Sequence, residues 1–324
     1  MGRVHAKAWQ AIAGAQLMGL VDTDPEALSA VGNDMGVPGY RDLDAALRDQ
    51  DTDVVDVCLP THLHRATAES LFSAGKHVIC EKPLALTLED ARAMMEAAQA
   101  AQRKLLVGHV VRFFPVYQQA RRLILDRALG QIGTIKTFRG GAYPHGWQDW
   151  YGDPQKSGTL ATDLLIHDID FLLWCLGPVT RVYAKSLAEH IDSPADHILA
   201  SLRFDSGVIA QLEGTWAYPK GFSYGFDIAG AEGLIHFDSA ENAPIRTLLR
   251  SSSQAGAPVE VPENPVAVSP YQRQLEHFLA VIADNATPLV TAHDGYEALA
   301  ISLAIRNSIH RGQAITLHSG NEAP

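Results

Sequence analysis

Cysteine is scarce in this chain, and no cysteine stands close to another. The 324 residues contain three cysteines, Cys58, Cys80 and Cys175, each within an apolar stretch and none in a CxxC pair. This spacing argues against a disulfide-stapled secreted scaffold and against a cysteine-based zinc site. The pattern predicts small buried thiols in a reducing compartment, and we therefore expect a cytoplasmic protein.

Basic charge and long apolar runs are also in short supply. Acidic residues outnumber basic ones by 37 to 26, which gives a net charge of -11. Nucleic acids and anionic membranes attract basic surfaces, so we expect neither as a partner. No apolar stretch reaches the roughly 20 residues that a membrane-spanning helix requires. The composition, 47% hydrophobic and 19% charged, is that of an ordinary globular protein.

The first third of the chain alternates strand-like and helix-like patterns. Apolar strands are expected at 15–22, 53–60, 76–83 and 105–110, and helices at 25–36, 61–75 and 87–104. We expect Thr61 to cap the second of these helices and Thr87 to cap the third. Apolar strands separated by helices predict a parallel sheet that is covered on both faces.

After about residue 118 the pattern changes. Strand-like stretches follow one another between turn residues, with helices only at 160–175, 271–284 and 294–311. This arrangement predicts an α/β fold in two parts: a doubly wound parallel sheet in residues 1–118 and an α+β domain with a large mixed or antiparallel sheet in residues 119–324. The Ser- and Pro-rich segment 251–270 is expected to be a surface loop.

The opening sequence MGRVHAKAW resembles the end of a dinucleotide-binding motif. Gly2 opens a helix, and Asp22 stands about 20 residues further on, at the end of an apolar strand, where a carboxylate binds the ribose of NAD. The alternative is a plain helix start followed by a turn-initiating Asp. The carboxylate favours NAD over NADP because it would repel a 2′-phosphate. The first strand and the first two glycines of G-x-G-x-x-G are absent. We therefore expect either that the natural product is longer or that this chain binds NAD poorly.

Two segments contain residue types suited to acid–base chemistry. Lys82 closes a predicted strand at its carboxyl end, where ligands bind in such sheets; alternatively it is a surface lysine. In SGTLATDLLIHDIDFLLW, Asp163 and His167 are four residues apart and would share one face of a helix, which Asp170 extends. A hydrogen-bonded core histidine is the alternative for His167. His62 and His64 have no third ligand at a suitable spacing, so no metal site is expected.

Taken together, these motifs resemble those of the Gfo/Idh/MocA oxidoreductase family. The resemblance covers residues 1 to about 170 and is carried by GRVHAKAW, VDTD, CLPTHLH, CEKPLAL, GHVVRFFP and SGTLATDLLIHDID. It implies an N-terminal Rossmann-type domain. It also implies that Lys82 polarises the reacting hydroxyl, that His167 is the acid–base and that Asp163 contacts substrate beside it.

The resemblance also implies the remaining site residues. The expected cofactor-binding residues are Gly2, Arg3, Asp22, Pro60, Thr61, His64, Glu81, Lys82 and Arg112. Arg112 pairing with a structural carboxylate is an equal alternative. The expected substrate-binding residues are Lys82, His109, Trp147, Asp149, Trp150, Tyr151, Asp163 and His167. For the four residues at 147–151, the alternative is a loop anchored by its aromatic side chains.

These residues predict an NAD(P)-dependent dehydrogenase, NAD being favoured, that acts on a secondary hydroxyl of a sugar, inositol or derivative. A neutral histidine accepts the hydroxyl proton, and a lysine stabilises the developing alkoxide. An NAD-dependent glycosidase-type hydrolase on the same scaffold and a non-catalytic sugar or dinucleotide sensor are the alternatives. From the resemblance we also expect a homodimer or homotetramer formed through the C-terminal sheet.

Overall fold

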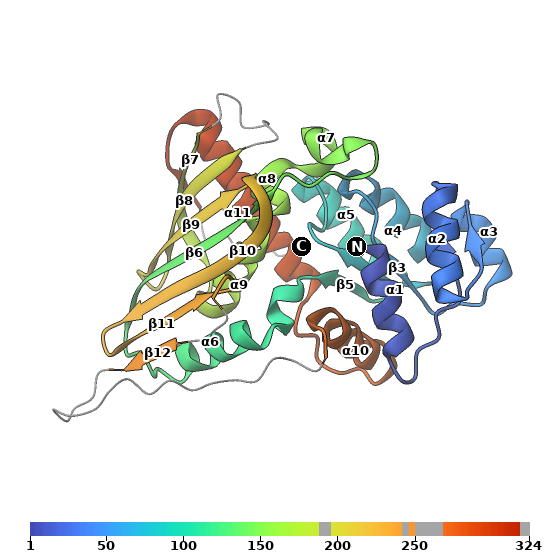
Figure 1. The fold of residues 1–324 in the computed structure, drawn as a ribbon, viewed down its shortest axis with the longest axis horizontal. Helices are drawn as coiled ribbons and strands as arrows, with labels where there is room; N and C mark the ends of the chain where they lie inside the picture. The colour runs from blue at the N-terminus through green and yellow to red at the C-terminus, as the bar shows by residue number, and fades with distance from the viewer. Residues whose placement is uncertain (188–195, 242–245, 250–267, 318–324) are drawn as a thin grey trace.

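The chain forms two units that lie side by side (Figure 1). The computed structural model describes residues 1–187, 196–241, 246–249 and 268–317. One unit contains the N-terminal helices and short parallel strands, and the other is built on one large sheet. The segment 251–270, expected to be a surface loop, lies outside the described residues except for its last three positions.

The strands of the N-terminal unit are all parallel, as predicted, but they form two separate groups. The groups are β1 (Leu20–Val21) with β2 (Gly39–Tyr40), and β3 (Val54–Val57), β4 (His77–Glu81) and β5 (Leu105–Gly108). Within the described chain, β1 pairs only with β2, and β3 only with β4. Of the strand expected at 15–22, only Leu20 and Val21 form a strand among the described residues, because only these two pair with β2.

Helices surround these strands, and most begin where the sequence predicts. They are α1 (Gly2–Ala11), α2 (Pro25–Met35), α3 (Leu43–Asp49), α4 (His64–Ser73) and α5 (Leu88–Ala100). The hydroxyl of Thr87 accepts the backbone N–H of Asp90, so its predicted capping role is confirmed. The prediction that Thr61 caps α4 is wrong. Thr61 lies inside a 3-10 turn, η1 (Thr61–Leu63), which makes no side-chain cap bond and runs directly into α4.

The second unit is an eight-stranded mixed sheet, as predicted. Its strands are β6 (Ile132–Ala142), β7 (Val179–Ser186), β8 (His197–Phe204), β9 (Ile209–Thr215), β10 (Ala217–Gly230), β11 (Gly233–Asp238), β12 (Arg246–Leu249) and β13 (Ile315–Thr316). Their order is β12-β11-β10-β6-β9-β8-β7-β13, and among the described strand pairs only β6–β9 is parallel.

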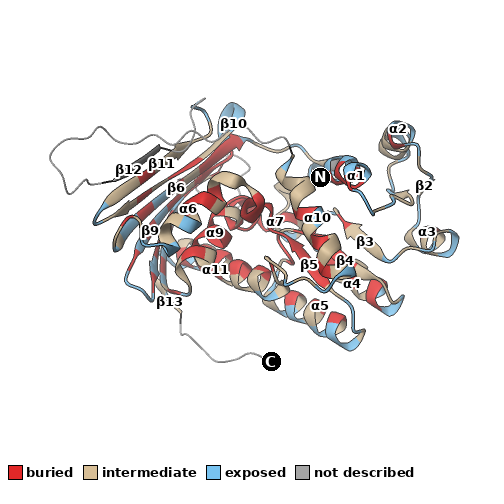
Figure 2. Ribbon diagram, turned by 90° about the horizontal axis from the view of Figure 1, so that it is seen from below, coloured by how far each residue is buried: buried red, intermediate tan, exposed pale blue. Residues whose placement is uncertain are grey.

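Helices cover one face of this sheet, and no helix of the described residues covers the other (Figure 2). The remaining helical segments are η2 (Val110–Phe113), α6 (Pro115–Leu125), η3 (Trp147–Gly152), α7 (Pro154–Ser157), α8 (Thr159–Asp163), α9 (Ile166–Leu176), α10 (Pro270–Ala283) and α11 (Ala292–Arg311). Alternate residues of β8, such as Ala200 and Leu202, are buried toward α9 and α11. Tyr183, Leu199 and Ile209 are exposed large apolar side chains of β7, β8 and β9.

Two hydrophobic cores hold the molecule together, and the second half of the chain contributes to both. One core joins the large sheet to α8, α9 and part of α11. The other joins β3, β4 and β5 to α1, α4 and α5, and it includes Leu275 and Phe278 of α10 and Leu299 of α11. A domain boundary at 118–119 remains our proposal, with α10 returning to pack on the first unit. Among the described residues, no helix is long and apolar enough to cross a membrane.

Candidate active site

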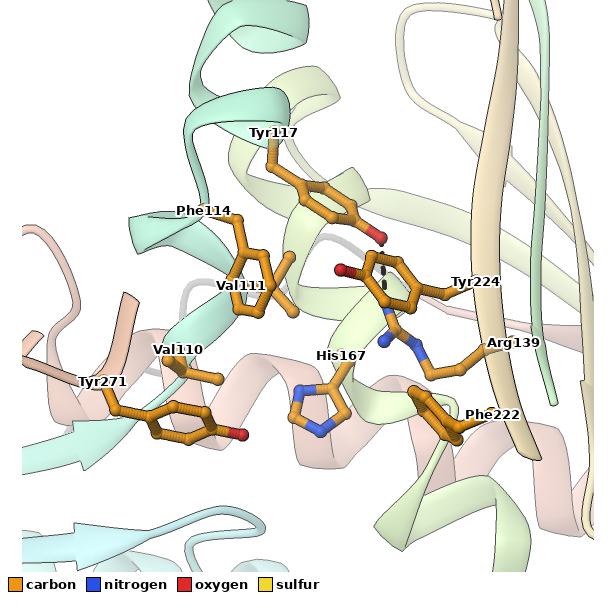
Figure 3. Close-up of a pocket in the computed structure, with 9 residues that line it drawn as sticks. All are labelled: Val110, Val111, Phe114, Tyr117, Arg139, His167, Phe222, Tyr224 and Tyr271. Atoms are coloured by element: carbon orange, nitrogen blue, oxygen red, sulfur yellow. Dashed lines mark hydrogen bonds between the residues drawn. The ribbon is translucent and has the colours of Figure 1, made fainter. Parts of the chain in front are cut away.

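A small cavity lies where the two units meet (Figure 3). Its volume is about 100 Å³, and its walls come from η2, α6, β6, α9, β10 and α10. The lining residues are Val110, Val111, Phe114, Tyr117, Arg139, His167, Phe222, Tyr224 and Tyr271. The cavity therefore combines an aromatic and aliphatic wall with one imidazole and one guanidinium. Of the residues predicted from sequence for the site, it contains His167.

His167 is the one group in this wall suited to exchange a proton near neutral pH. It lies in the first turn of α9, and its Nδ1 atom is buried without a hydrogen-bond partner among the described residues. Burial away from water, together with the positive charges of Lys82 and Arg139, holds the pKa of His167 well below its ordinary value. The imidazole is therefore neutral at pH 7 and has a nitrogen free to accept a proton.

Lys82 and Asp163 form a direct contact beside this histidine. The Nζ atom of Lys82 lies 2.7 Å from the backbone oxygen of Asp163 and 3.0 Å from its Oδ1 atom. The Lys82–Pro83 bond is cis. Both side chains are largely buried, so the ammonium is held in one position at the carboxyl end of β4.

Asp163 and His167 do not lie on one continuous helix, so that prediction is wrong. The helix breaks at Leu164–Leu165, between α8 and α9, where the N–H of Leu165 bonds to the carbonyl of Leu160 in a widened turn. Asp163 consequently ends one helix and contacts Lys82, while His167 begins the next and lines the cavity. Asp170 does not extend a shared face either, because it is fully buried and contacts Arg112.

Arg112 binds carboxylates rather than facing the cavity. Its Nε and Nη2 atoms donate to both oxygens of Asp170, and Nη2 also donates to Asp294 at 3.0 Å. Nη1 donates to the carbonyl of Leu289. We considered two roles for Arg112, cofactor binding and pairing with a structural carboxylate, and the structure shows the pairing. His109 is also fully buried, 3.9 Å from Asp170, with no hydrogen bond on either ring nitrogen in the described structure.

A second buried ion pair supports the opposite wall of the cavity. Arg139 of β6 donates from Nε and Nη2 to Asp168, and from Nη2 to the hydroxyl of Tyr117. Its guanidinium also lies over the ring of Tyr224, 5.1 Å from the ring centre. Sequence reasoning missed Arg139, although a signal exists, because it occupies an inward-facing position in the alternating pattern of β6. A charge at such a position requires a buried partner.

His5 links helix α1 to the strand that carries Lys82. Its Nδ1 lies 2.9 Å from Asp56 and its Nε2 lies 3.1 Å from Glu81, the residue before Lys82. Burial opposes the charge, but the contacts with Asp56, Cys58 and Glu81 outweigh it and raise the pKa of His5 far above its usual value. His5, Asp56 and Cys58 are close enough for a metal site. However, burial raises the pKa of Cys58 to about 12, so the group is better described as an ion pair beside a neutral thiol.

The residues expected to hold a dinucleotide differ in how free they are. Gly2 and Arg3 form the start of α1, the helix end at which phosphates bind. Asp22 is exposed at the end of β1 and accepts only the N–H of Asp24 in the described structure, so its carboxylate has capacity for ribose hydroxyls. Pro60 precedes the buried Thr61 in the turn after β3. These residues fit a dinucleotide.

His64 is committed to the main chain. It is buried, with Nδ1 3.0 Å from the carbonyl of Pro83 and Nε2 2.9 Å from that of Leu59. Burial lowers its pKa, so the ring is neutral. His64 therefore joins the turn after β3 to the segment after Lys82 rather than presenting a free nitrogen.

Asp149, Trp150 and Tyr151 of the loop predicted for substrate binding do not line this cavity. Trp150 stacks on Tyr151 with ring centres 4.0 Å apart, and the hydroxyl of Tyr143 donates to Asp149. Burial and the charge of Asp163 raise the pKa of the Tyr151 hydroxyl. The backbone of Trp147 begins η3.

The comparisons with known proteins agree with this architecture. Residues 1–109 match the model of an oxidoreductase family with an NAD-binding Rossmann fold. Fold, site and this match define the class as an NAD-dependent oxidoreductase. Residues 117–236 match the GFO/IDH/MocA C-terminal domain, so the two matches together span most of the chain. The chain belongs to the Gfo/Idh/MocA family.

Similar proteins cover nearly the whole chain. The 1,5-anhydro-D-fructose reductase of Ensifer adhaerens is 29% identical, over 95% of this chain and 92% of the relative. The inositol 2-dehydrogenase of Rhizobium meliloti is 28% identical, over 98% of this chain and 96% of the relative. The crystal structure of GenD2 from gentamicin A biosynthesis, in complex with NAD, superposes with a TM-score of 0.86 at 25% identity, covering 98% of this chain and 94% of that one.

Proposed function

We propose that this protein catalyses the NAD-dependent oxidation of a secondary hydroxyl in a sugar, an inositol or a related polyol, and the reverse reduction. The observation that carries the proposal is a buried imidazole, His167, that lines a cavity and is kept neutral by burial and by the charge of Lys82, which Asp163 holds in place. Two relatives support the substrate class, because one is named as a reductase of a sugar derivative, 1,5-anhydro-D-fructose, and the other as an inositol dehydrogenase.

The chain's own residues would hold the cofactor at the carboxyl ends of the parallel strands. Gly2 and Arg3 would face the pyrophosphate, Asp22 the ribose, and Pro60 and Thr61 the adjoining part of the dinucleotide. Bound there, NAD supplies the acceptor for the hydride that leaves the substrate carbon.

The protein handles the proton and the charge. His167 accepts the proton of the substrate hydroxyl, since its imidazole is neutral at pH 7 and one nitrogen is unpartnered. The Lys82 ammonium stabilises the negative charge that develops on the same oxygen. Asp163 keeps that ammonium in place from its side chain and its backbone. In the reverse direction His167 returns the proton to the alkoxide.

The test is a panel of sugars, inositols and sugar derivatives with NAD or NADP, monitored for nicotinamide reduction. We expect at least one polyol to give stoichiometric NADH. Release of nitrophenol from a glycoside without net NADH would instead assign the chain to the NAD-dependent hydrolases. Sugar binding with neither reaction would assign it to the sensors.

Asp22 provides a matched test of cofactor choice. The carboxylate disfavours a 2′-phosphate, so the ratio of kcat/KM for NAD to that for NADP should exceed one. In Asp22→Ser this ratio should fall by at least tenfold, while the exposed Asp44→Ser control in α3 keeps the wild-type ratio.

We also propose that the protein works in the cytoplasm as a homodimer or homotetramer. The three cysteines are free, as expected in a reducing compartment. The exposed apolar side chains Tyr183, Leu199 and Ile209 of the sheet support association through this face. Sedimentation of the wild type and of Leu199→Lys tests the second point, because a lysine at the centre of such an interface should yield monomers.

A further inference from the structure

One residue of the cavity wall, Tyr271, comes from helix α10 rather than from the large sheet or the helices that cover it. Tyr271 is the second residue of α10, whose first turn is capped by Ser269. This helix packs on α1 and η2, so the tyrosine arrives from the side of the N-terminal unit. Its ring lies against His5, with ring centres 5.9 Å apart, and its other end lines the cavity. Tyr271 therefore stands between the His5–Glu81 ion pair and His167.

The hydroxyl of Tyr271 has no hydrogen-bond partner among the described residues. Figure 3 shows it directed toward the His167 ring across the cavity. The structure shows no hydrogen bond between this hydroxyl and a described residue, and the buried Nδ1 atom of His167 also has no partner there. A half-buried phenol normally has a partner. The space between these two groups thus has hydrogen-bonding capacity on both sides.

The rest of the wall suits a carbohydrate. Nη1 of Arg139 makes no hydrogen bond within the described chain, while the other two nitrogens of this guanidinium are fixed by Asp168 and Tyr117. Phe114 and Phe222 supply apolar surface on either side. A polyol ring presents hydroxyl oxygens at its edge and C–H groups on its faces, and this wall offers donors and aromatic faces.

We propose that Tyr271 is a substrate-binding residue whose hydroxyl hydrogen-bonds an oxygen of the polyol held between α10 and His167. The inference rests on the proposed function, which it extends by naming a residue that discriminates among polyols. Burial and the charge of Glu81 raise the pKa of the phenol, so it remains a donor throughout the neutral range. A substrate with an oxygen at this position is preferred over the analogue that has lost it.

The decisive variant is Tyr271→Phe, which removes only the hydroxyl and retains the ring contact with His5. We expect kcat/KM for the polyol to fall about tenfold, mostly through KM, as for the loss of one hydrogen bond. KM for NAD should not change. The matched control is Tyr296→Phe in α11, whose hydroxyl contacts Arg92 outside the cavity. This control should behave like the wild type.

A series of mono-deoxy analogues of the same polyol identifies the oxygen. For one analogue, the wild type and Tyr271→Phe should have equal kcat/KM, because the bond is already missing. The inference is overturned if Tyr271→Phe and the wild type have the same kcat/KM for the parent polyol. It is also overturned if the two proteins differ in kcat/KM for every analogue as much as they do for the parent.

Calorimetry separates this inference from the proposed function. If the wild type forms no NADH but binds a polyol, and Tyr271→Phe weakens that binding about tenfold, the function is overturned and the binding role stands. If no polyol binds to the NADH-loaded wild type, both are overturned.

Discussion

Asp163 holds the ammonium of Lys82 through both its backbone oxygen and its carboxylate. The two contacts, at 2.7 and 3.0 Å, join the end of a parallel strand to the end of a helix in the other unit. The charge is thus positioned before any substrate arrives. Preorganised charge of this kind lowers a barrier without reorganisation at the moment of reaction.

Replacing Lys82 by methionine should therefore affect turnover more than binding. We expect kcat for polyol oxidation in Lys82→Met to fall by about 10²–10³-fold, as for other lost oxyanion donors. Steady-state kinetics on the best polyol measures this. Lys76→Met is the control, since Lys76 precedes the other end of the same strand and its ammonium donates to the carbonyl of Thr52. Equal loss in both variants would point to damage to the strand rather than to the chemistry.

The lowered pKa of His167 predicts the pH range in which the enzyme loses activity in acid. Because its pKa lies well below 6.5, the imidazole stays neutral as pH falls through 6.5 and is protonated only at lower pH. The acid limb of kcat/KM for polyol oxidation should consequently lie below pH 6.5. In His167→Asn, turnover should fall by about 10²–10⁴-fold, whereas His310→Asn on the exposed end of α11 should retain it. An acid limb centred above pH 7 would contradict the assignment.

The ion pair between His5 and Glu81 predicts a pH window of stability. The raised pKa of His5 makes its contribution complete below pH 6.5 and smaller as pH rises above that value. The lowered pKa of Glu81 makes its contribution complete above pH 4.5 and lost as pH falls below that value. The free energy of unfolding lost in His5→Gln should therefore be largest between these two pH values. Urea titrations of both proteins at pH 4, 5.5 and 8 measure it, and a pH-independent difference would refute the ion pair.

Arg112 should matter for folding rather than for substrate contact. Removing it leaves Asp170 fully buried without a counter-charge, so Arg112→Met should lower the free energy of unfolding by about 3–5 kcal/mol. Arg112→Met combined with Asp170→Leu should recover part of this loss, because the orphaned charge is gone. Urea denaturation measures both variants against the control Arg48→Met on the exposed face of α3. For this control we expect the free energy of unfolding to fall by about 0.5 kcal/mol or less.

The sequence was informative wherever local pattern decides structure. Alternation of apolar strands and helices correctly predicted a parallel sheet followed by a mixed one, and the cap at Thr87 correctly marked α5. Lys82, Asp163 and His167 were recognised because each stands in a distinctive local motif. The helix break between Asp163 and His167 was missed, since an unbroken helical period continues through the leucines at 164 and 165.

The rest of the cavity depends on contacts that no local pattern encodes. Tyr224 reaches Arg139 only because β10 pairs with β6 in register, with Tyr224 opposite Arg139 itself. Tyr271 reaches His5 only because α10, which follows strand β12 in the chain, docks on α1. Such residues are found from the packing of distant elements, which a single sequence does not specify.

The two carboxylates that Arg112 binds set a limit on how the molecule moves. Asp170 belongs to the helix of His167 and Asp294 to the capped start of α11, while Arg112 itself follows the last parallel strand. A clamshell opening of the two units would have to pull a buried guanidinium away from a fully buried carboxylate. Hinge motion is therefore costly, and ligands should enter by local rearrangement of side chains and loops around the cavity rather than by separation of the units.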